Sequence, residues 1–365
     1  MTNQVPVKKK ILIEDTTPQA SFSLLEKLNA HLPFSLPVLR RLQFASKIAQ
    51  TKQPHVLHAC YEGNNSPEGE FAAAFVDLTR HPETQVWIYS TVEDRVVDPL
   101  DLDTMTVTGT GEEEDIELVL ALLRRVRTIA AEEGHSAISE EGKDGREVLV
   151  GSLHELLRRE LLTREVGLKK TGVVPEGLDW EYCHKWLFRV PEGLPEGYRG
   201  EKQTAEGDGQ NNEKEQGGRG KGQGERLPQG KQGDMLKWDR LKKEDVRKVQ
   251  SRTVIRREEA TLMMLPSAVL REVDGTPVAW SFIGFDGTFL TLHVEEEYRR
   301  LGLAKAVACK LMRDHLPDFG DDGWGAADVI VTNTKSQGVC SSIGGKPGWI
   351  MSWALLDLSS LEDPL

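Results

Sequence analysis

The fold of the C-terminal part of the chain is decided by the stretch Phe289-Leu290-Thr291-Leu292-His293-Val294-Glu295-Glu296-Glu297-Tyr298-Arg299-Arg300-Leu301-Gly302-Leu303-Ala304. Its first six residues predict a strand, and an amphipathic helix is expected over 303–316. A strand that enters a helix through a turn containing Arg299, Gly302 and the small Ala304 leaves the first N–H groups of that helix available to an anion. We therefore predict a pyrophosphate-binding turn here, although an ordinary turn with a solvated basic corner has the same spacing.

Working outward, the C-terminal part predicts an antiparallel meander followed by a strand-helix-strand unit. Two Asp-Gly pairs, at 274–275 and 286–287, mark the turns between the meander strands. The expected elements are a helix over 242–255, strands over 267–273, 277–285 and 289–294, a helix over 303–316, a strand over 329–332, a helix over 336–343 and a last strand. Where a meander turns into such a unit the strand directions change, and a gap that suits a ligand opens in the sheet.

A compositional break divides the chain of 365 residues. Residues 196–234 contain 11 glycines and a single branched aliphatic residue, Leu227, so this segment cannot bury enough apolar surface to offset its ordering entropy. We expect a disordered, Gly-rich charged linker there. It separates an N-terminal domain, 1–195, from a C-terminal domain, 235–365.

The N-terminal part predicts a mixed α/β domain with a meander of its own. Apolar residues at helical spacing predict helices over 23–32, 36–49, 116–131 and 148–162, and short apolar runs predict strands over 55–61, 71–78, 85–90 and 180–190. His55, His58 and Cys60 lie close together, but no second pair of ligands follows at a zinc-finger spacing, so we expect no metal.

Composition excludes several classes of protein. A formal charge of -12 argues against nucleic acid and anionic membranes as partners. No run approaches the 18 or more apolar residues that cross a bilayer. The four cysteines form no CxxC pair, which is typical of a reducing compartment. We expect a cytoplasmic protein whose anionic ligand binds at a local site.

The run from Val278 to Ala304 resembles the GNAT superfamily of acyl-CoA-dependent N-acyltransferases, whose pyrophosphate loop reads Q/R-x-x-G-x-G/A. Arg299, Gly302 and Ala304 match that loop position for position. The resemblance covers residues 237–357 and is closest to glycine N-acyltransferase-like proteins of fungi and arthropods. It implies a mostly antiparallel sheet flanked by helices, with acetyl-CoA or another acyl-CoA as substrate, an amine or amino acid as acceptor, and no metal.

The resemblance also assigns the cofactor contacts. The strand before the loop would hold the pantetheine arm through its backbone, and the loop amides would hold the pyrophosphate. The residues that carry over are Leu292, Val294, Arg299, Arg300, Leu301, Gly302, Leu303, Ala304 and, from a downstream Asn-x-x-Ala-x-x-Leu-Tyr pattern, Asn333.

Two catalytic positions depart from the family pattern. Cys340 stands where the family often has a Tyr that protonates the leaving thiolate, so Cys340 is either this acid or a packing residue. The acidic base of glycine N-acyltransferases corresponds to Thr288, which cannot act as one. His293 is our candidate base, with Glu295 and Glu296 as alternatives, because aminolysis of a thioester needs a proton acceptor beside the amine. Strand alternation places His293 on the face of Phe289 and Thr291.

The N-terminal part resembles, more faintly, the non-catalytic first half of the same proteins, through Phe34-Ser35-Leu36-Pro37-Val38-Leu39 and Phe75-Val76-Asp77-Leu78. It lacks the R-x-x-G-x-G/A loop, so we interpret it as a degenerate GNAT-like half that shapes the acceptor site. The sequence thus predicts an acyl-CoA-dependent N-acyltransferase. The alternatives are a CoA-binding sensor without turnover and a protein-interaction module.

Overall fold

The computed structural model describes residues 9–361 except 18, 48–53, 65, 67–68, 136–146, 173, 190–234, 254 and 256. The predicted linker, 196–234, therefore lies outside the described residues. Among the helices in the described ranges, none has the length and apolar character needed to cross a membrane.

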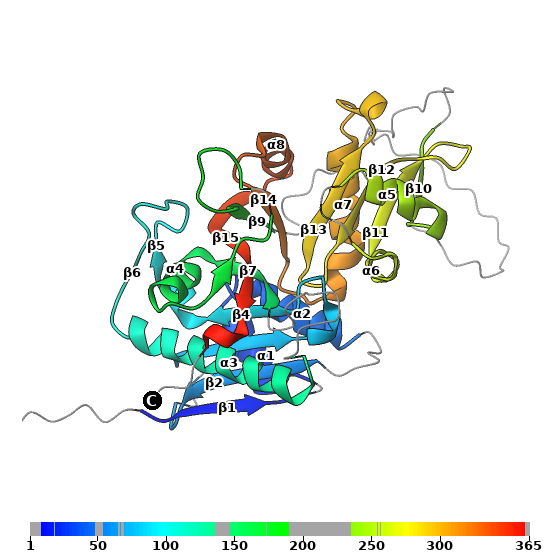
Figure 1. Cartoon of the computed structure of the whole chain (residues 1–365). Helices are drawn as coiled ribbons and strands as arrows, with labels where there is room; N and C mark the ends of the chain where they lie inside the picture. The colour runs from blue at the N-terminus through cyan, green and yellow to red at the C-terminus, as the bar shows by residue number, and fades with distance from the viewer. Residues whose placement is uncertain are drawn as a thin grey trace, which may run out of the picture.

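One mixed sheet of 13 strands runs through the described part of both halves of the chain (Figure 1). Its strands pair in the order β1-β2-β3-β4-β7-β15-β9-β14-β13-β12-β11-β10, and β8 pairs with β15. All neighbours are antiparallel except β4 with β7 and β13 with β14. The strands are β1 (Ile11–Asp15), β2 (His55–Tyr61), β3 (Phe71–Val76), β4 (Val86–Ser90), β7 (Glu147–His154), β8 (Leu168–Lys169), β9 (Cys183–Arg189), β10 (Lys237–Asp239), β11 (Ser267–Arg271), β12 (Pro277–Ile283), β13 (Thr288–Val294), β14 (Trp324–Ile330) and β15 (Lys346–Asp357); β5 (Val96–Val97) and β6 (Thr106–Val107) pair separately.

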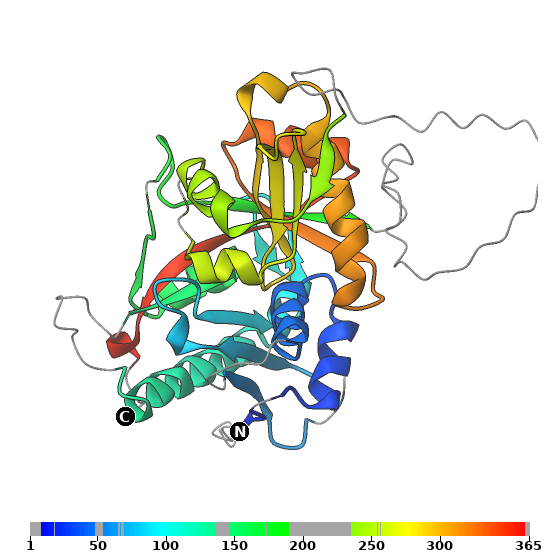
Figure 2. The same ribbon diagram turned by 90° about the vertical axis from the view of Figure 1, so that its right-hand side faces the viewer.

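Helices cover both faces of this sheet, which confirms the predicted mixed α/β fold. They are α1 (Phe22–Ala30), α2 (Leu36–Ala45), α3 (Glu112–Glu132), α4 (Glu155–Thr163), α5 (Val246–Ser251), α6 (Glu259–Met264), α7 (Leu303–His315) and α8 (Thr334–Ser342). Alternate residues of β2 and β3 support two separate cores, one under α3 and one under α1 and α2. In the C-terminal half, α7 lies on one side of β11 to β13 and α5 and α6 lie on the other (Figure 2).

The two halves repeat the same order of elements. Apart from the short β5, β6 and β8, each half runs strand, two helices, three strands, helix, strand, helix, strand. The last strands are exchanged: β9 of the first half lies between β14 and β15 of the second, while β15 reaches back to pair with β7 (Figure 1). The site described below is therefore built on a sheet to which both halves contribute.

Several predicted elements change. The helix predicted over 148–162 is wrong in its first half, where β7 forms. Val148 and Val150 are β-branched, and pairing of β7 with β4 and β15 buries both side chains, which outweighs the helical spacing. The helix proper begins at Glu155, capped by the His154 side chain. β14 begins at Trp324, earlier than predicted, and the helix predicted over 242–255 shortens to α5.

Candidate functional site

The sheet forks between β13 and β14. These parallel strands pair at only two positions, Thr288 with Ala326 and Phe289 with Ala327. β13 then continues to Val294 and β14 to Ile330 without further pairing between them in the described residues. Within the described residues, the backbone edge of β13 from Leu290 onward therefore has no pairing with β14, and the two strands separate where the sheet changes direction, as predicted.

A β-bulge interrupts β13 beside this fork. Trp280 pairs with His293 and Phe282 with Leu290, so one residue of β12 lies opposite two residues of β13. Thr291, within the bulge, has φ of +54°. The prediction that His293 shares a face of the sheet with Phe289 is wrong. The extra residue in the bulge shifts the alternation of side chains by one position, so His293 shares a face with Leu290 instead.

The turn after β13 has the geometry of an anion site. Gly302 has φ of +76° and is the N-cap of α7, whose first turn contains no acidic residue. Arg300 also has positive φ, +66°, and the Arg299 Nε donates to the Val294 carbonyl at 3.2 Å. Leu303 is buried and anchors the helix, while Leu301 is exposed. A helix N-terminus with a glycine cap and adjacent arginines fits a phosphate group.

The remaining predicted cofactor residues lie around the fork. Leu292 and Val294 are half-buried on β13, and Ala304 is half-buried in the first turn of α7. Asn333 is exposed and caps α8, with its Oδ1 accepting the Ser336 N–H at 3.1 Å.

His293 lies on the face of the sheet that carries α5. Its ring stacks on Trp280 at 4.7 Å between centroids, and Lys248 of α5 lies over the same indole. Burial lowers the pKa of His293, which outweighs the charge of Glu295 3.7 Å from Nε2. The imidazole is therefore a neutral ring at physiological pH and has the form that a proton acceptor needs.

The alternative bases differ from His293 in their surroundings. Burial alone would raise the pKa of Glu295, but hydrogen bonds and charge from Lys248 and Arg252 lower it, so this carboxylate is held as an ion-pair partner. Glu296 is exposed. A cleft of about 340 Å³ begins beside Glu295; it is lined by Lys248, Arg252, Glu272, Asp274, Thr276, Val278, Glu295, Glu297 and Tyr298.

Cys340 belongs to α8, which packs against α7 and β14, and its side chain lies in a core cluster that includes residues of α7. Its side chain is 7% exposed, and burial raises the pKa of the thiol to about 12. These surroundings favour the packing role over the acid role.

A buried ion pair at the fork is absent from the sequence prediction. Lys185 of β9 pairs in register with Asp328 of β14, and Nζ lies 2.6 Å from Oδ1. Each is the charged residue in the middle of a largely apolar strand, a pattern that marks the two residues singly but does not show that they pair.

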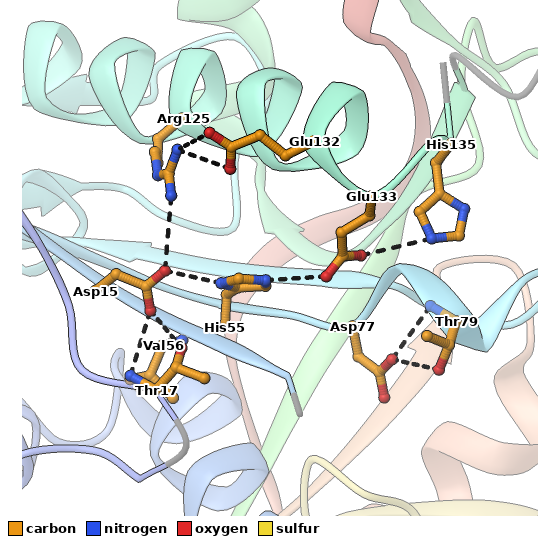
Figure 3. Close-up of polar contacts among 10 residues, drawn as sticks. All are labelled: Asp15, Thr17, His55, Val56, Asp77, Thr79, Arg125, Glu132, Glu133 and His135. Carbon is orange, nitrogen blue, oxygen red and sulfur yellow. Dashed lines mark hydrogen bonds and ion pairs between the residues drawn. The ribbon is translucent and has the colours of Figure 1, made fainter. Parts of the chain in front are cut away.

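The histidines of β2 have protein partners. His55 lies between two carboxylates, with Nδ1 2.7 Å from Asp15 and Nε2 3.2 Å from Glu133, and Arg125 and His135 extend the cluster (Figure 3). No group of three or more potential metal ligands occurs within the described ranges.

Comparisons with known proteins agree with this architecture. Residues 8–182 match the family described as the acyl-CoA N-acyltransferase verG N-terminal domain. That match supports the GNAT superfamily. The chain is similar in structure to a protein from Drosophila, with a TM-score of 0.55 and 13% identity over 95% of this chain and 99% of that chain, which shows a shared fold.

Two further solved structures are similar at lower scores. A GCN5-related N-acetyltransferase from Sphaerobacter thermophilus has a TM-score of 0.46 and 12% identity over 95% of this chain and 96% of that chain. A tandem GNAT protein from the clavulanic acid biosynthesis pathway has a TM-score of 0.43 and 8% identity over 96% of this chain and 99% of that chain. No curated protein matches the sequence. A specific relationship to glycine N-acyltransferases stays a prediction.

Proposed function

We propose that the protein is an acyl-CoA-dependent N-acyltransferase that transfers an acyl group, with acetyl the first to test, to an amine by direct attack in a ternary complex. The observation that carries the proposal is the succession along β13 of a fork, a bulge and a glycine-capped helix N-terminus. An elongated ligand with a phosphate at one end and a reactive group at the other fits this succession.

Each predicted contact has a physical role in this proposal. The backbone of Leu292 and Val294 would bind the pantetheine arm along the open edge of β13. The first N–H groups of α7 would bind the pyrophosphate, with Arg299 and Arg300 adding charge. Asn333 would contact the cofactor from the N-terminus of α8.

The chemistry follows from the groups on the α5 face. The amine nitrogen attacks the thioester carbonyl carbon, the C–S bond breaks, and the amine proton goes to His293, whose lowered pKa keeps it neutral. Binding and orientation of the two substrates supply much of the rate. The cleft beside Glu295 is the route that we assign to the acceptor.

A second candidate function is a CoA-binding sensor without turnover. It is favoured by Cys340, whose buried thiol has a pKa of about 12, and by Thr288, which takes the place of an acidic base and donates to Asp286. A panel of amines that includes glycine, assayed with acetyl-CoA and longer acyl-CoAs for CoA release and for the acylated amine by mass spectrometry, separates the candidates. Amine-dependent release supports the transferase. Binding without release supports the sensor, and absence of binding supports an interaction module.

A further inference from the structure

The proposed reaction needs a proton for the departing CoA sulfur, and Cys340 is poorly suited to give one. Its thiol lies in the core on α8, which packs against α7, whereas His293 and Trp280 lie on the face that carries α5. A proton donor on the α5 face would complete the reaction.

Lys185 and Asp328 form a buried ion pair on that face. Their side chains are 0% and 6% exposed, and the Lys185 Nζ lies 2.6 Å from the Asp328 carboxylate. Apart from this contact, neither the ammonium nor the carboxylate has a hydrogen-bond partner in the described part of the chain. Burial raises the pKa of Asp328 to about 6, while the charge and the hydrogen bond of Lys185 lower it, so the contact with Lys185 favours the ionised carboxylate.

Strand register places the pair at the fork. Ala327 is the last residue of β14 that pairs with β13, and Asp328 is the next. Phe289, which pairs with Ala327, lies on the α7 face with Ile283, so Asp328 and its partner Lys185 face the other way. They share this face with His293, from the opposite arm of the fork.

A buried ion pair often adds little to the stability of a fold, because the free energy needed to remove two charges from water offsets their mutual attraction. This pair leaves N–H donors of the ammonium unused, and it lies directly after the last residues at which β13 and β14 pair, so it has the chemistry to act on a substrate atom that binds between the two strands. The Lys185 ammonium has protons to give to a thiolate.

We propose that Lys185 donates the proton to the CoA sulfur and that Asp328 is the positioning residue that holds the ammonium in place. This inference rests on the proposed transferase function. The new N–C bond forms as the C–S bond breaks with its electron pair moving to sulfur. His293 receives the amine proton, Lys185 gives one to the thiolate, and both groups exchange protons with water after products leave.

The inference also gives the strand exchange a function. Lys185 belongs to β9, which precedes residues 190–234, whereas the turn at Gly302 and His293 follow them. The first half of the chain would thus supply the proton donor to the site of the second.

The test compares two variants with the full-length protein: Lys185→Met, and Lys185→Met with Asp328→Asn, which leaves no unpaired charge buried. Lys169→Met, which removes an exposed lysine paired with Glu147, is the control. Calorimetry measures acetyl-CoA affinity, and CoA release with the amine panel measures turnover. We expect both Lys185 variants to lose about 100-fold or more in turnover, as for loss of a general acid, with affinity changed less than about threefold and Lys169→Met unaffected.

Turnover of the folded double variant within about threefold of the parent overturns the inference while leaving the proposed function intact. A parallel loss of affinity and turnover, or failure of both variants to fold, assigns the pair a structural role and also overturns it. A parent protein that binds acetyl-CoA but acylates no amine removes the proposed function and this inference together.

Discussion

The two halves of the molecule begin their central helices in the same way and then differ in charge. α3 and α7 each follow the third meander strand, and each has a glycine N-cap with positive φ, +92° at Gly111 and +76° at Gly302. The first turn of α3 contains four acidic residues, Glu112, Glu113, Glu114 and Asp115, and that of α7 contains none. The fold supplies the helix N-terminus twice, and of the two only the first turn of α7 lacks the acidic residues that disfavour a phosphate, which is why we propose the phosphate site at α7.

The approach to the helix differs as well. β13 reaches α7 through the short turn 295–302, whereas the segment 91–111 between β4 and α3 is longer and also contains the β5–β6 pair; each connection contains one 3-10 helix. β4 forks from β7 as β13 does from β14, but its register with β3 is uninterrupted and contains no bulge. The N-terminal half thus keeps the fork and lacks the bulge and the Arg-Arg-Leu-Gly turn, so we assign it a supporting role.

The largest expected effect is on the turn itself. Gly302→Glu places a side chain and a negative charge where the phosphates bind, so acetyl-CoA affinity should fall by about 100-fold or more, equal to about 2.7 kcal/mol. Calorimetric titration measures it. The matched control is Gly111→Glu, which carries the same backbone strain at positive φ and should leave affinity unchanged. Equal affinities of the two folded variants would show that the halves do not differ as described.

The variant His293→Gln tests the catalytic step that we assign to the C-terminal half. We expect turnover to fall by about 10- to 100-fold with acetyl-CoA affinity preserved, because the glutamine cannot accept a proton. Steady-state kinetics with the acceptor found in the amine panel measures this. Unchanged turnover would exclude His293 as the base.

Cys340→Ala has a smaller expected effect. Because the thiol is buried in the core and its pKa is about 12, we expect turnover to fall less than about tenfold. The same assay applies, with melting temperature as a check on packing. A loss of about 100-fold at constant affinity would instead make Cys340 the general acid.

The smallest effect on binding is expected from His55→Gln, which changes the supporting half. Burial lowers the pKa of His55, but the hydrogen bonds and charges of Asp15 and Glu133 outweigh it and the net pKa is raised. A raised folded-state pKa stabilises the fold below the ordinary value of about 6.5, and the contribution is lost as pH rises through the folded-state value.

The variant should therefore melt below the parent at pH 6, with a smaller difference at pH 9, while acetyl-CoA affinity stays constant. Thermal melts across pH check the first point and calorimetry the second. A difference that grows with pH would contradict the assignment of a charged His55 between two carboxylates.

Local signals predicted much of the C-terminal half. The Asp-Gly turns, the spacing from Leu303 onward and the turn at Gly302 are encoded in short segments, so the meander, α7 and its glycine cap followed from the sequence. The strand exchange could not be predicted, because nothing in the local sequences of β9 and β15 indicates which strands they pair with. β7 was missed for the same reason: its pairing with β15 is distant in sequence.

At the site, the sequence predicted that His293 lies on β13 but not which face of the sheet its side chain occupies. The bulge at Thr291 depends on the register of two strands, and no residue type near it demands one. Lys185 and Asp328 were likewise invisible as a pair, since 142 residues separate them in the chain and only β9–β14 pairing brings them together.

The central claim, that the C-terminal half alone holds the acyl-CoA, is tested most directly by the stoichiometry of acetyl-CoA binding to the full-length protein in a calorimetric titration. The account predicts one molecule per chain, since the four acidic residues at the start of α3 exclude a phosphate from the first half. Two molecules per chain would contradict the distinction between the halves, and absence of binding would contradict the acyl-CoA site itself.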